Sequence, residues 1–317
     1  MPEISVLIPA FRPRYLDLAI ASVLAQTFRD FELILSDDSD GDDVENVTSK
    51  WPDPRIRYVR NPRRQEPGAN RDHLLSIAQG RFVKFVFDDD FLLPRSLELL
   101  HQAAVGFDAK LVFHSRFLVG PAGHTLGAPS ALPAGAISPL DPSVVFTQLV
   151  ASGQNVIGEP SNILLDAAAL REMPHPFGLD GDRMRFLTDV ALYVNLAHAG
   201  HRMAGIGASL SAFRVHPSQA SSQGGPIFSA GLFEWELFTR WSADHGHIGP
   251  DDCRAAIERL WDQYSFHVDA FPELNAFLRG SSHPDGNGRF LSPEFRQAVV
   301  AGWQAIADRV RAPAVAA

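Results

Sequence analysis

The sequence predicts an α/β fold in which a mostly parallel central sheet is flanked by helices and followed by a helical C-terminal region. Two observations lead to this prediction. In the first 120 residues, short apolar runs alternate with segments in which apolar residues recur at helical spacing. Such alternation is typical of βαβ units, whose strands pair in parallel. Beyond Pro226, three longer segments show helical spacing, which indicates a separate helical region.

The N-terminal part of the chain contains four expected strands and three expected helices. The apolar runs predict strands at Ile4–Ile8, Phe31–Leu35, Ile56–Val59 and Phe82–Phe87. The segments of helical period predict helices at Pro13–Gln26, Gly68–Ala78 and Pro94–Val105. Ligands of parallel α/β sheets bind beyond the carboxyl ends of the strands, so we expect the functional residues directly after these strands.

The rest of the sequence predicts a long loop, a short α/β stretch and the C-terminal helices. Gly, Pro, Ala and Ser dominate residues 120–141, which predicts the loop. A helix over Thr188–Ala199 precedes two short strands, at Met203–Ile206 and Leu210–Phe213. The C-terminal helices are expected at Phe228–Asp244, Asp251–Phe266 and Pro293–Arg311, the last with Ser292 as its N-cap. We expect an α/β domain over residues 1–220 and a helical region over residues 221–317 for packing, acceptor or dimer contacts.

Composition and charge exclude several classes of protein. With 317 residues, 45% of them hydrophobic, the chain can bury a sizeable core, which excludes a disordered protein. The 28 basic and 37 acidic residues give a net charge of −9, which excludes a general nucleic-acid binder. Cys253 is the single cysteine, so an internal disulfide and a cysteine-based zinc site are excluded. No signal peptide and no apolar stretch of about 18 residues is present, so we expect a cytoplasmic protein without a transmembrane segment.

An acidic turn follows the second expected strand. Asp37, Asp38, Asp40, Asp42 and Asp43 place five carboxylates within seven residues. A calcium loop of the EF-hand type does not fit, because a glycine at loop position six would place a valine at position twelve. Two interpretations stay open at this point: an Asp-rich turn that stabilises the start of a helix, and a binding site.

A second acidic motif, Asp88–Asp90, follows the apolar run at Phe82–Phe87. Three adjacent carboxylates between apolar flanks repel one another unless a partner compensates their charge. A divalent cation is such a partner, and Mg²⁺ or Mn²⁺ favours a few carboxylates together with diphosphate oxygens. The alternative is an exposed acidic turn. The position after an expected central strand favours the metal site.

Together these motifs resemble the family 2 glycosyltransferases, which have the GT-A fold. They follow one another in the order of that family over residues 4–222, about two thirds of the chain. The segments similar to those of the family are Ile4–Arg12 (opening strand and nucleotide loop), Asp37–Ser39 (acidic turn), Gly68–Asp72 with Ala78–Gly80 (arginine-bearing helix), Asp88–Asp90 with Pro94 (DXD-type motif), Gly158–Ser161 and Thr188-Asp189 (acceptor side), and Phe213–His216 (closing segment).

The resemblance implies a role for each matching position. The residues implied to contact the nucleotide sugar are Pro9, Ala10, Phe11, Arg12, Asp37, Asp38, Arg71 and Asp88. Asp89 is implied to coordinate a Mn²⁺ or Mg²⁺ ion that bridges the diphosphate, and Asp90 and His216 are further candidate ligands. Two positions depart from the family pattern: Phe87 stands where the first aspartate is usual, and Asp72 replaces the asparagine after the helix arginine. Which aspartate of the triplet binds the metal therefore stays open, with Asp89 favoured.

Asp189 is the candidate catalytic base. An acceptor hydroxyl must lose its proton as it attacks the anomeric carbon, and a positioned carboxylate can take that proton. Asp189 follows Thr188 at the expected start of a helix, where the helix dipole keeps a carboxylate ionised. The alternative is an aspartate that only stabilises the helix start. A single base opposite the leaving group implies inversion, as does the resemblance.

We therefore expect a metal-dependent, inverting glycosyltransferase of bacterial surface glycan or glycoconjugate synthesis. Its donor is expected to be a UDP, dTDP or GDP sugar, and its acceptor a hydroxyl of a carbohydrate, a lipid-linked sugar or a protein. It would act in the cytoplasm, at most peripherally at the inner membrane face, with a homodimer left open. One alternative is a sugar-phosphate nucleotidyltransferase, although Ala10–Pro13 is not the glycine-rich basic loop that such enzymes use. The other is a non-catalytic nucleotide- or glycan-binding protein of the same fold.

Overall fold

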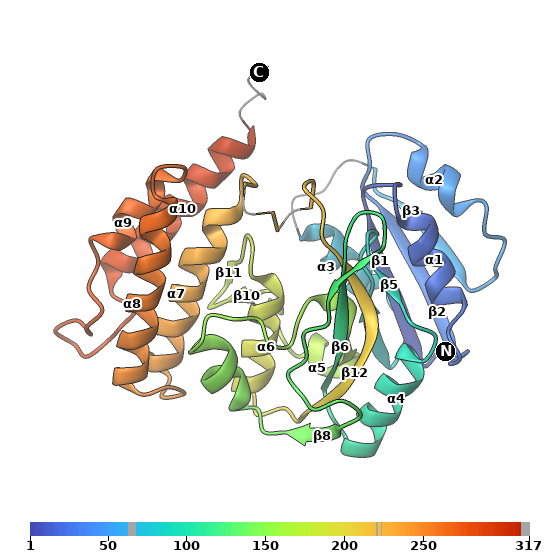
Figure 1. Cartoon of the computed structure of the whole chain (residues 1–317), viewed down its shortest axis with the longest axis horizontal. Coiled ribbons are helices and arrows are strands. Elements are labelled where there is room, and N and C mark those ends of the chain that lie inside the picture. The colour runs from blue at the N-terminus through green and yellow to red at the C-terminus, as the bar shows by residue number, and fades with distance from the viewer. Residues whose placement is uncertain (63–67, 220, 223, 312–317) are drawn as a thin grey trace. The chain divides into compact units, whose positions relative to one another are not determined.

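The computed structural model describes residues 1–62, 68–219, 221–222 and 224–311. The chain forms two compact units (Figure 1). The first unit comprises Met1–Pro142, Val156–Pro176 and Leu196–His216, and the second comprises Ser143–Asn155, Phe177–Asn195 and Pro217–Ala317. The domain boundary predicted at residues 220–221 falls at Ala220, which lies outside the described residues.

A ten-stranded sheet forms the centre of the first unit. Along its main path the strand order is β3-β2-β1-β4-β9-β6-β12-β5, while β7 pairs with β6 and β8 with β12. The strands β1 to β4 pair in parallel, whereas β9 joins them to β6 by antiparallel pairing on both of its sides. The bounds are β1 Ile4–Ala10, β2 Phe31–Asp37, β3 Ile56–Arg60, β4 Phe82–Phe85, β5 Phe91–Leu92, β6 Leu111–Val119, β7 Thr125–Gly127, β8 Ile137–Leu140, β9 Ile163–Asp166 and β12 Met203–Arg214.

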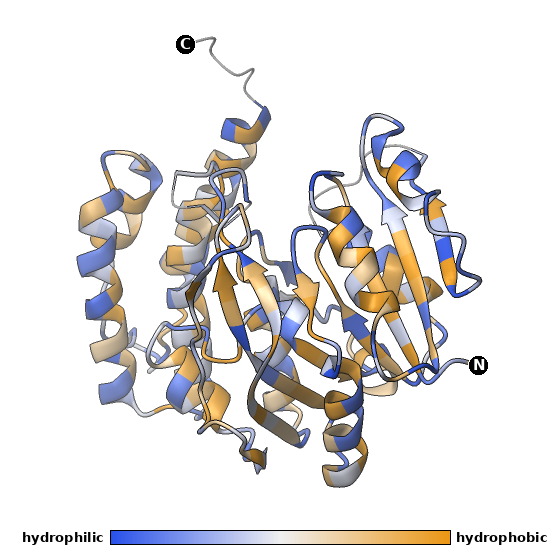
Figure 2. Cartoon of the chain, turned by 45° about the vertical axis from the view of Figure 1, so that its right-hand side comes forward, coloured by the Kyte–Doolittle hydropathy of each residue, from blue (hydrophilic) through white to orange (hydrophobic). Residues whose placement is uncertain are grey.

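Alternating side chains of the parallel strands fix which helices cover each face. In β1, Ile4, Val6 and Ile8 belong to one apolar core together with residues of α1, α2 and α4. The intervening side chains point to the opposite face, and α3 contacts β1 and β2 without belonging to that core. Figure 2 shows the strands mostly in the hydrophobic colour. The helices of this unit are α1 Leu16–Leu24, α2 Asp43–Thr48, α3 Ala69–Ile77, α4 Ser96–Phe107, the 3₁₀ helix η2 Pro160–Asn162 and α5 Ala167–Arg171.

Helices dominate the second unit. The aromatic side chains of α7 are buried except for that of Phe228, which is partly exposed, and Phe233 and Phe238 are fully inaccessible to solvent. Ser292 caps α10, because its hydroxyl accepts the backbone N–H of Phe295 at 3.2 Å. The bounds are the π-helix η1 Val145–Val150, β10 Gly178–Leu179, β11 Asp182–Arg183, α6 Thr188–His198, α7 Phe228–Asp244, α8 Pro250–His267, η3 Pro272–Leu274, α9 Asn275–Leu278 and α10 Pro293–Arg311.

Two local predictions are wrong. Residues 120–141 are not a loop throughout, because β7 and β8 lie within them and pair with the sheet. The two strands expected at Met203–Ile206 and Leu210–Phe213 form one strand, β12. Small residues between them mimic a turn in the sequence, but the strand continues through them with register shifts near Ser209 and stays paired with β6.

Within the described residues, no helix has the length and apolar character needed to cross a membrane.

Candidate active site

The parallel strands of the first unit end beside one another. The register pairs Ala10 of β1 with Asp37 of β2, and Leu7 of β1 with Phe85 of β4. The backbone N–H of Val86 still donates to the Leu7 carbonyl at 3.0 Å, so the acidic triplet begins just beyond this last pairing. The nucleotide loop, the acidic turn and the triplet therefore lie along one edge of the sheet, where parallel α/β sheets bind ligands.

Asp88 holds the loop that follows β1. Its Oδ2 atom accepts the backbone N–H groups of Phe11 at 2.8 Å and of Arg12 at 2.7 Å. Desolvation raises the pKa of Asp88 to about 6, and the two N–H groups oppose that rise. Phe11 and Arg12 are thus fixed to the triplet. The predicted contact of Asp88 with the ribose stays a prediction.

Asp89 and His216 form a close pair at this edge. His216 Nε2 lies 3.1 Å from Asp89 Oδ2, with the side chains 4% and 23% exposed. The ring of Tyr15, whose centroid is 5.7 Å from that of His216, lies beside them. A carboxylate and an imidazole are both ligands of divalent transition metals, so Mn²⁺ fits this pair.

Asp90 is buried under the same edge. Its Oδ1 atom accepts the backbone N–H of Arg214 at 3.0 Å, whereas its buried Oδ2 atom has no hydrogen-bond donor in bonding geometry among the described residues. Burial raises the pKa of Asp90 well above its usual range, and the charge of Asp89 adds to the rise. A cation would compensate such a carboxylate, so Asp90 is chemically suited to the same ion.

Arg214 ties the end of β12 to the triplet. Its guanidinium donates to the carbonyl oxygens of Asp89 at 3.0 Å, Gly120 at 3.1 Å and Pro121 at 3.2 Å. Its Cζ atom also lies 4.2 Å from the centroid of the Tyr15 ring, a cation–π distance. These contacts fix the backbone after β12 so that His216 lies beside Asp89.

In the described part of the chain, no three His, Cys, Asp or Glu side chains already form a metal-binding group.

The two aspartates of the acidic turn differ in their surroundings. Asp37 is fully buried and accepts the Tyr58 hydroxyl at 2.6 Å and the Ser39 backbone N–H at 2.8 Å. Burial raises the pKa of Tyr58, and the hydrogen bond to Asp37 adds to this effect. Asp38 is only partly buried and accepts the Asn61 amide at 3.0 Å. Of the two, Asp38 is the more accessible to a nucleotide base.

Arg71 lies in the first turn of α3, which is anchored to the same edge. The neighbouring Asn70 donates to the Ser36 carbonyl at 3.0 Å and lies 3.2 Å from the Asn61 amide. These bonds fix the start of α3 beside the acidic turn. The sequence-predicted residues Pro9 to Arg12, Asp37, Asp38, Arg71, Asp88 to Asp90 and His216 all belong to this first unit.

A buried lysine under the triplet is a site feature that the sequence analysis missed. Lys84 of β4 is fully buried and donates to the Ser161 carbonyl, and the Ser161 hydroxyl accepts the Phe87 N–H at 3.1 Å. Burial lowers the pKa of Lys84 to about 7, against the opposing charge of Asp90. In the sequence, the sign of this buried charge is a lysine inside an otherwise apolar strand. Beside it, the Arg116 guanidinium pairs with Glu159 at 2.6 Å.

Asp189, the candidate base, belongs to the second unit. It lies in the first turn of α6 and is partly exposed. The Asn155 amide donates to Asp189 Oδ2 at 2.7 Å, and Asp189 Oδ1 lies 2.9 Å from the Val190 N–H. Asn155 could not be identified from the sequence, because 34 residues separate it from its partner.

The central sheet and its flanking helices form an α/β fold of the GT-A type. Residues 5–141 match the model of the family described as Glycosyl transferase family 2. This match agrees with the resemblance of the sequence motifs to that family.

Curated relatives match part of the chain as well. Over 108 residues the chain is 42% identical to GalNAc(5)-diNAcBac-PP-undecaprenol beta-1,3-glucosyltransferase of Campylobacter jejuni, a match covering 33% of this chain and 35% of that protein. Over 97 residues it is 29% identical to UDP-Glc:alpha-D-GlcNAc-diphosphoundecaprenol beta-1,3-glucosyltransferase WfgD of Escherichia coli, covering 30% and 38%. The chain therefore spans little more than a third of the length of these curated relatives.

A solved structure resembles nearly the whole chain. It is the S. aureus TarS fragment 1–349 in complex with UDP-GlcNAc, with a TM-score of 0.59 and 18% identity over 97% of this chain and 82% of that one. At this identity the likeness concerns the fold alone. The predicted fold, with a mostly parallel sheet and a helical C-terminal region, is confirmed.

Proposed function

We propose that the protein is a metal-dependent, inverting glycosyltransferase that moves a sugar from a nucleoside diphosphate sugar to an acceptor hydroxyl. The observation that carries the proposal is the pair of Asp89 and His216, 3.1 Å apart, at the ligand-binding edge of a family 2 domain. The Oδ2 atom of Asp90, which has no hydrogen-bond partner among the residues that the structure describes, supports it, because a cation beside this atom would compensate a buried carboxylate.

The donor side of the site is formed by the first unit. Phe11 and Arg12, whose backbone amides Asp88 holds, would contact the base and ribose, and the partly exposed Asp38 would accept a hydrogen bond from the base. Arg71, in the first turn of α3, would supply a guanidinium to the donor. Asp89, His216 and Asp90 would hold Mn²⁺ or Mg²⁺. When bound, this ion neutralises the charge that grows on the leaving diphosphate.

The acceptor side relies on Asp189. Its carboxylate takes the proton of the acceptor hydroxyl as that oxygen attacks the anomeric carbon and the bond to the diphosphate breaks. The Asn155 amide holds one oxygen of this carboxylate, so the side chain keeps one orientation. A single displacement by one base gives inversion at the anomeric carbon.

The names of the relatives indicate candidate substrates for this chain. WfgD carries UDP-glucose and a diphosphoundecaprenol acceptor in its name, and the C. jejuni enzyme carries an undecaprenol-linked acceptor. We infer that this chain takes a UDP sugar and a lipid-linked sugar, in bacterial glycan synthesis, and works peripherally at the membrane that contains its acceptor.

The proposal is tested by incubating the chain with UDP-glucose or UDP-N-acetylglucosamine, Mn²⁺ and a short-chain diphosphopolyprenyl sugar. Release of UDP with formation of a longer lipid-linked glycan supports it. Release of pyrophosphate from UTP and a sugar phosphate would instead identify a nucleotidyltransferase. Nucleotide binding without transfer to any acceptor would identify a non-catalytic binding protein. A thermal-shift series with UDP, dTDP and GDP, with and without Mn²⁺, selects the base beforehand.

A further inference from the structure

A fully buried glutamate of α7 binds the turn that leads into α6. Glu234 accepts three consecutive backbone N–H groups, from Arg185 at 2.6 Å, Phe186 at 3.1 Å and Leu187 at 2.7 Å. Its Oε1 atom also accepts the indole N–H of Trp303 at 2.9 Å. Both oxygens of this carboxylate are therefore used.

The side chains of the same turn are held as well. The Arg185 guanidinium lies 5.7 Å from the ring centroid of Trp303 on α10, and the Phe186 ring packs edge-on against Phe228. Gly231, one helical turn before Glu234, makes room for Phe186, since a Cβ atom there would lie 2.8 Å from the ring. The helices α7 and α10 thus fix the backbone of residues 185–187 and the side chains of Arg185 and Phe186.

This turn leads directly to the candidate base. Residue Thr188 begins α6 and Asp189 follows it, so the direction of the turn sets where the Asp189 carboxylate points. The amides at the start of a helix usually receive a cap from a neighbouring residue. Here the amides in front of the helix receive it from a carboxylate 47 to 49 residues away. Asn155 holds the side chain of Asp189, and Glu234 holds the backbone in front of it.

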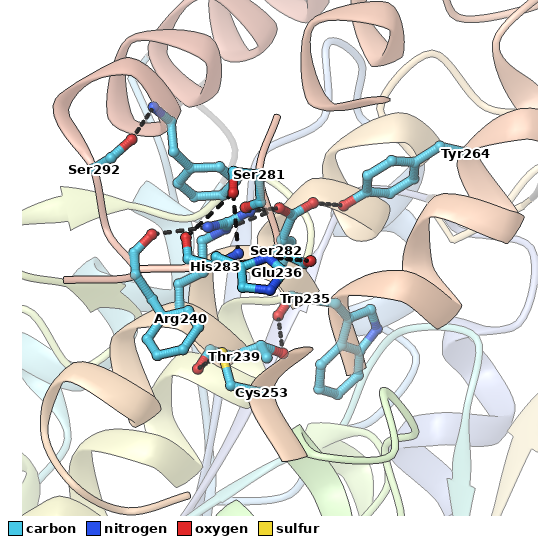
Figure 3. A network of polar contacts seen from close by, with 12 residues as sticks. Trp235, Glu236, Thr239, Arg240, Cys253, Tyr264, Ser281, Ser282, His283 and Ser292 are labelled. Carbon is cyan, nitrogen blue, oxygen red and sulfur yellow. Dashed lines mark hydrogen bonds and ion pairs between the residues drawn. The ribbon is translucent and has the colours of Figure 1, made fainter. Parts of the chain in front are cut away.

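Glu236 provides an internal comparison. It lies on the same helix and is also fully buried, but it faces Arg240 and the Tyr264 hydroxyl, which donates to it at 2.7 Å (Figure 3). The contacts of Glu236 join α7 to α8 and, through Arg240, to residues 281 and 290. None of its hydrogen bonds among the described residues reaches the turn at residues 185–187.

We propose that Glu234 is a positioning residue for glycosyl transfer, which acts by fixing the turn in front of Asp189. The proposal rests on the function proposed above, in which Asp189 is the base. It gives the helical C-terminal part of the chain a role in the reaction beyond packing.

The test is a double-mutant cycle with Glu234→Gln in the wild-type and Asp189→Asn backgrounds. The glutamine keeps the size of the side chain but points an NH₂ group at backbone donors, so the turn must shift. We expect kcat to fall by about 10²-fold, as for a small misplacement of a catalytic group, with the KM for the donor and the affinity for UDP unchanged. In the Asp189→Asn background the same substitution should have no further effect on kcat.

Two controls separate positioning from stability. Glu236→Gln removes a buried charge on the same helix and should lower the unfolding temperature while kcat stays at the wild-type value. Gly231→Ala keeps Glu234 but displaces Phe186, and should lower kcat without changing the KM for the donor. This second variant also decides the question if Glu234→Gln does not fold.

Distinct results overturn distinct statements. The role of Glu234 is rejected if kcat is unchanged in both Glu234→Gln and Gly231→Ala. It is also rejected if Glu234→Gln lowers kcat by the same factor in the wild-type and Asp189→Asn backgrounds. Unchanged hydrogen exchange at the amides of residues 185–187 in Glu234→Gln also rejects it, because the turn would not depend on the carboxylate. Absence of transfer by the wild-type protein rejects the proposed function itself.

Discussion

His216 Nε2 lies 3.1 Å from Asp89 Oδ2, although 127 positions separate the two residues in the chain. The contact depends on Arg214, which binds the carbonyl of Asp89 and directs the end of β12 over the acidic triplet. Strand pairing brings the aspartates to one edge of the sheet, and the residues that follow β12, much later in the chain, add an imidazole nitrogen. The candidate metal site is therefore completed only when β12 is in place.

Replacement of Asp189 by asparagine should remove the proposed catalytic base while it keeps the size of the side chain. We expect kcat to fall by about 10²- to 10⁴-fold, the usual contribution of a general base. The affinity for UDP should not change, because the residues proposed to bind the nucleotide belong to the first unit. The measurement is steady-state transfer together with calorimetry, and Asp182→Asn, an exposed position of β11, serves as control. Normal turnover by Asp189→Asn would show that another group is the base.

Lys84 should make the stability of the protein depend on pH in the alkaline range. Its pKa is about 7 when folded, against 10.5 in the unfolded chain, because burial disfavours the ammonium. Between these values the unfolded state binds the extra proton, so the free energy of unfolding should rise with pH by up to about 1.4 kcal/mol per unit. Lys84→Met should lose this slope.

The measurement is urea denaturation without metal between about pH 7.5 and pH 9.5. Lys110→Met is the control, since the hydrogen bond to Asp166 raises the pKa of Lys110 and leaves no slope in that range. Equal slopes in the wild type and Lys84→Met would mean that Lys84 stays charged in the folded protein.

Gly158 should be required for the backbone conformation of residues 158–162, the segment beside the acidic triplet. Its φ angle is +97°, and a Cβ atom would lie 2.3 Å from Asn162 Nδ2 and 2.6 Å from Arg116 Nη1. Gly158→Ala should therefore strain the backbone and also displace the Arg116 pair with Glu159. Gly123→Ala, with φ of +89° and open space around it, carries the backbone strain alone.

We expect the free energy of unfolding of Gly158→Ala to lie about 1–3 kcal/mol below that of Gly123→Ala. Chemical denaturation of both variants measures the difference. Equal values would show that residues 158–162 tolerate a side chain at this position.

Arg240 should contribute strongly to the stability of the second unit. It is buried, donates to Glu236 at 2.8 Å and binds the carbonyls of Ser281 at 2.7 Å and Phe290 at 2.8 Å (Figure 3). Removal of one partner from a buried ion pair leaves an uncompensated charge and costs about 3–5 kcal/mol. Arg240→Met should show this loss in urea denaturation, and the double variant with Glu236→Leu should recover part of it. A loss below about 1 kcal/mol in the single variant would contradict the account.

Much of the first unit could be predicted from the sequence because its information is local. Apolar runs such as Ile4–Ile8 mark buried parallel strands, and consecutive aspartates at strand ends mark the candidate site. The strand β6 was missed since its central residues His114, Ser115 and Arg116 interrupt the apolar pattern. These polar side chains are explained only by tertiary partners, such as the Ser96 hydroxyl 3.0 Å from His114.

The partners of the site residues could not be predicted for the same reason. The bonds of Lys84 to Ser161, Asn155 to Asp189 and Glu234 to residues 185–187 join positions 34 to 77 residues apart. No spacing rule links such positions, because the pairing depends on how strands and helices pack. The sequence therefore locates the candidate groups, and the fold determines what orients them.

The most direct test of the central claim is calorimetric titration of UDP into the wild type and Asp89→Asn, each with and without Mn²⁺. Asp42→Asn, whose side chain is 80% exposed, is the control. Mn²⁺ should tighten UDP binding by the wild type and the control at least about tenfold, which corresponds to about 1.4 kcal/mol. Asp89→Asn should lose that gain. An equal effect of Mn²⁺ on all three proteins, or none on the wild type, would contradict the assignment of this edge as a metal-dependent nucleotide site.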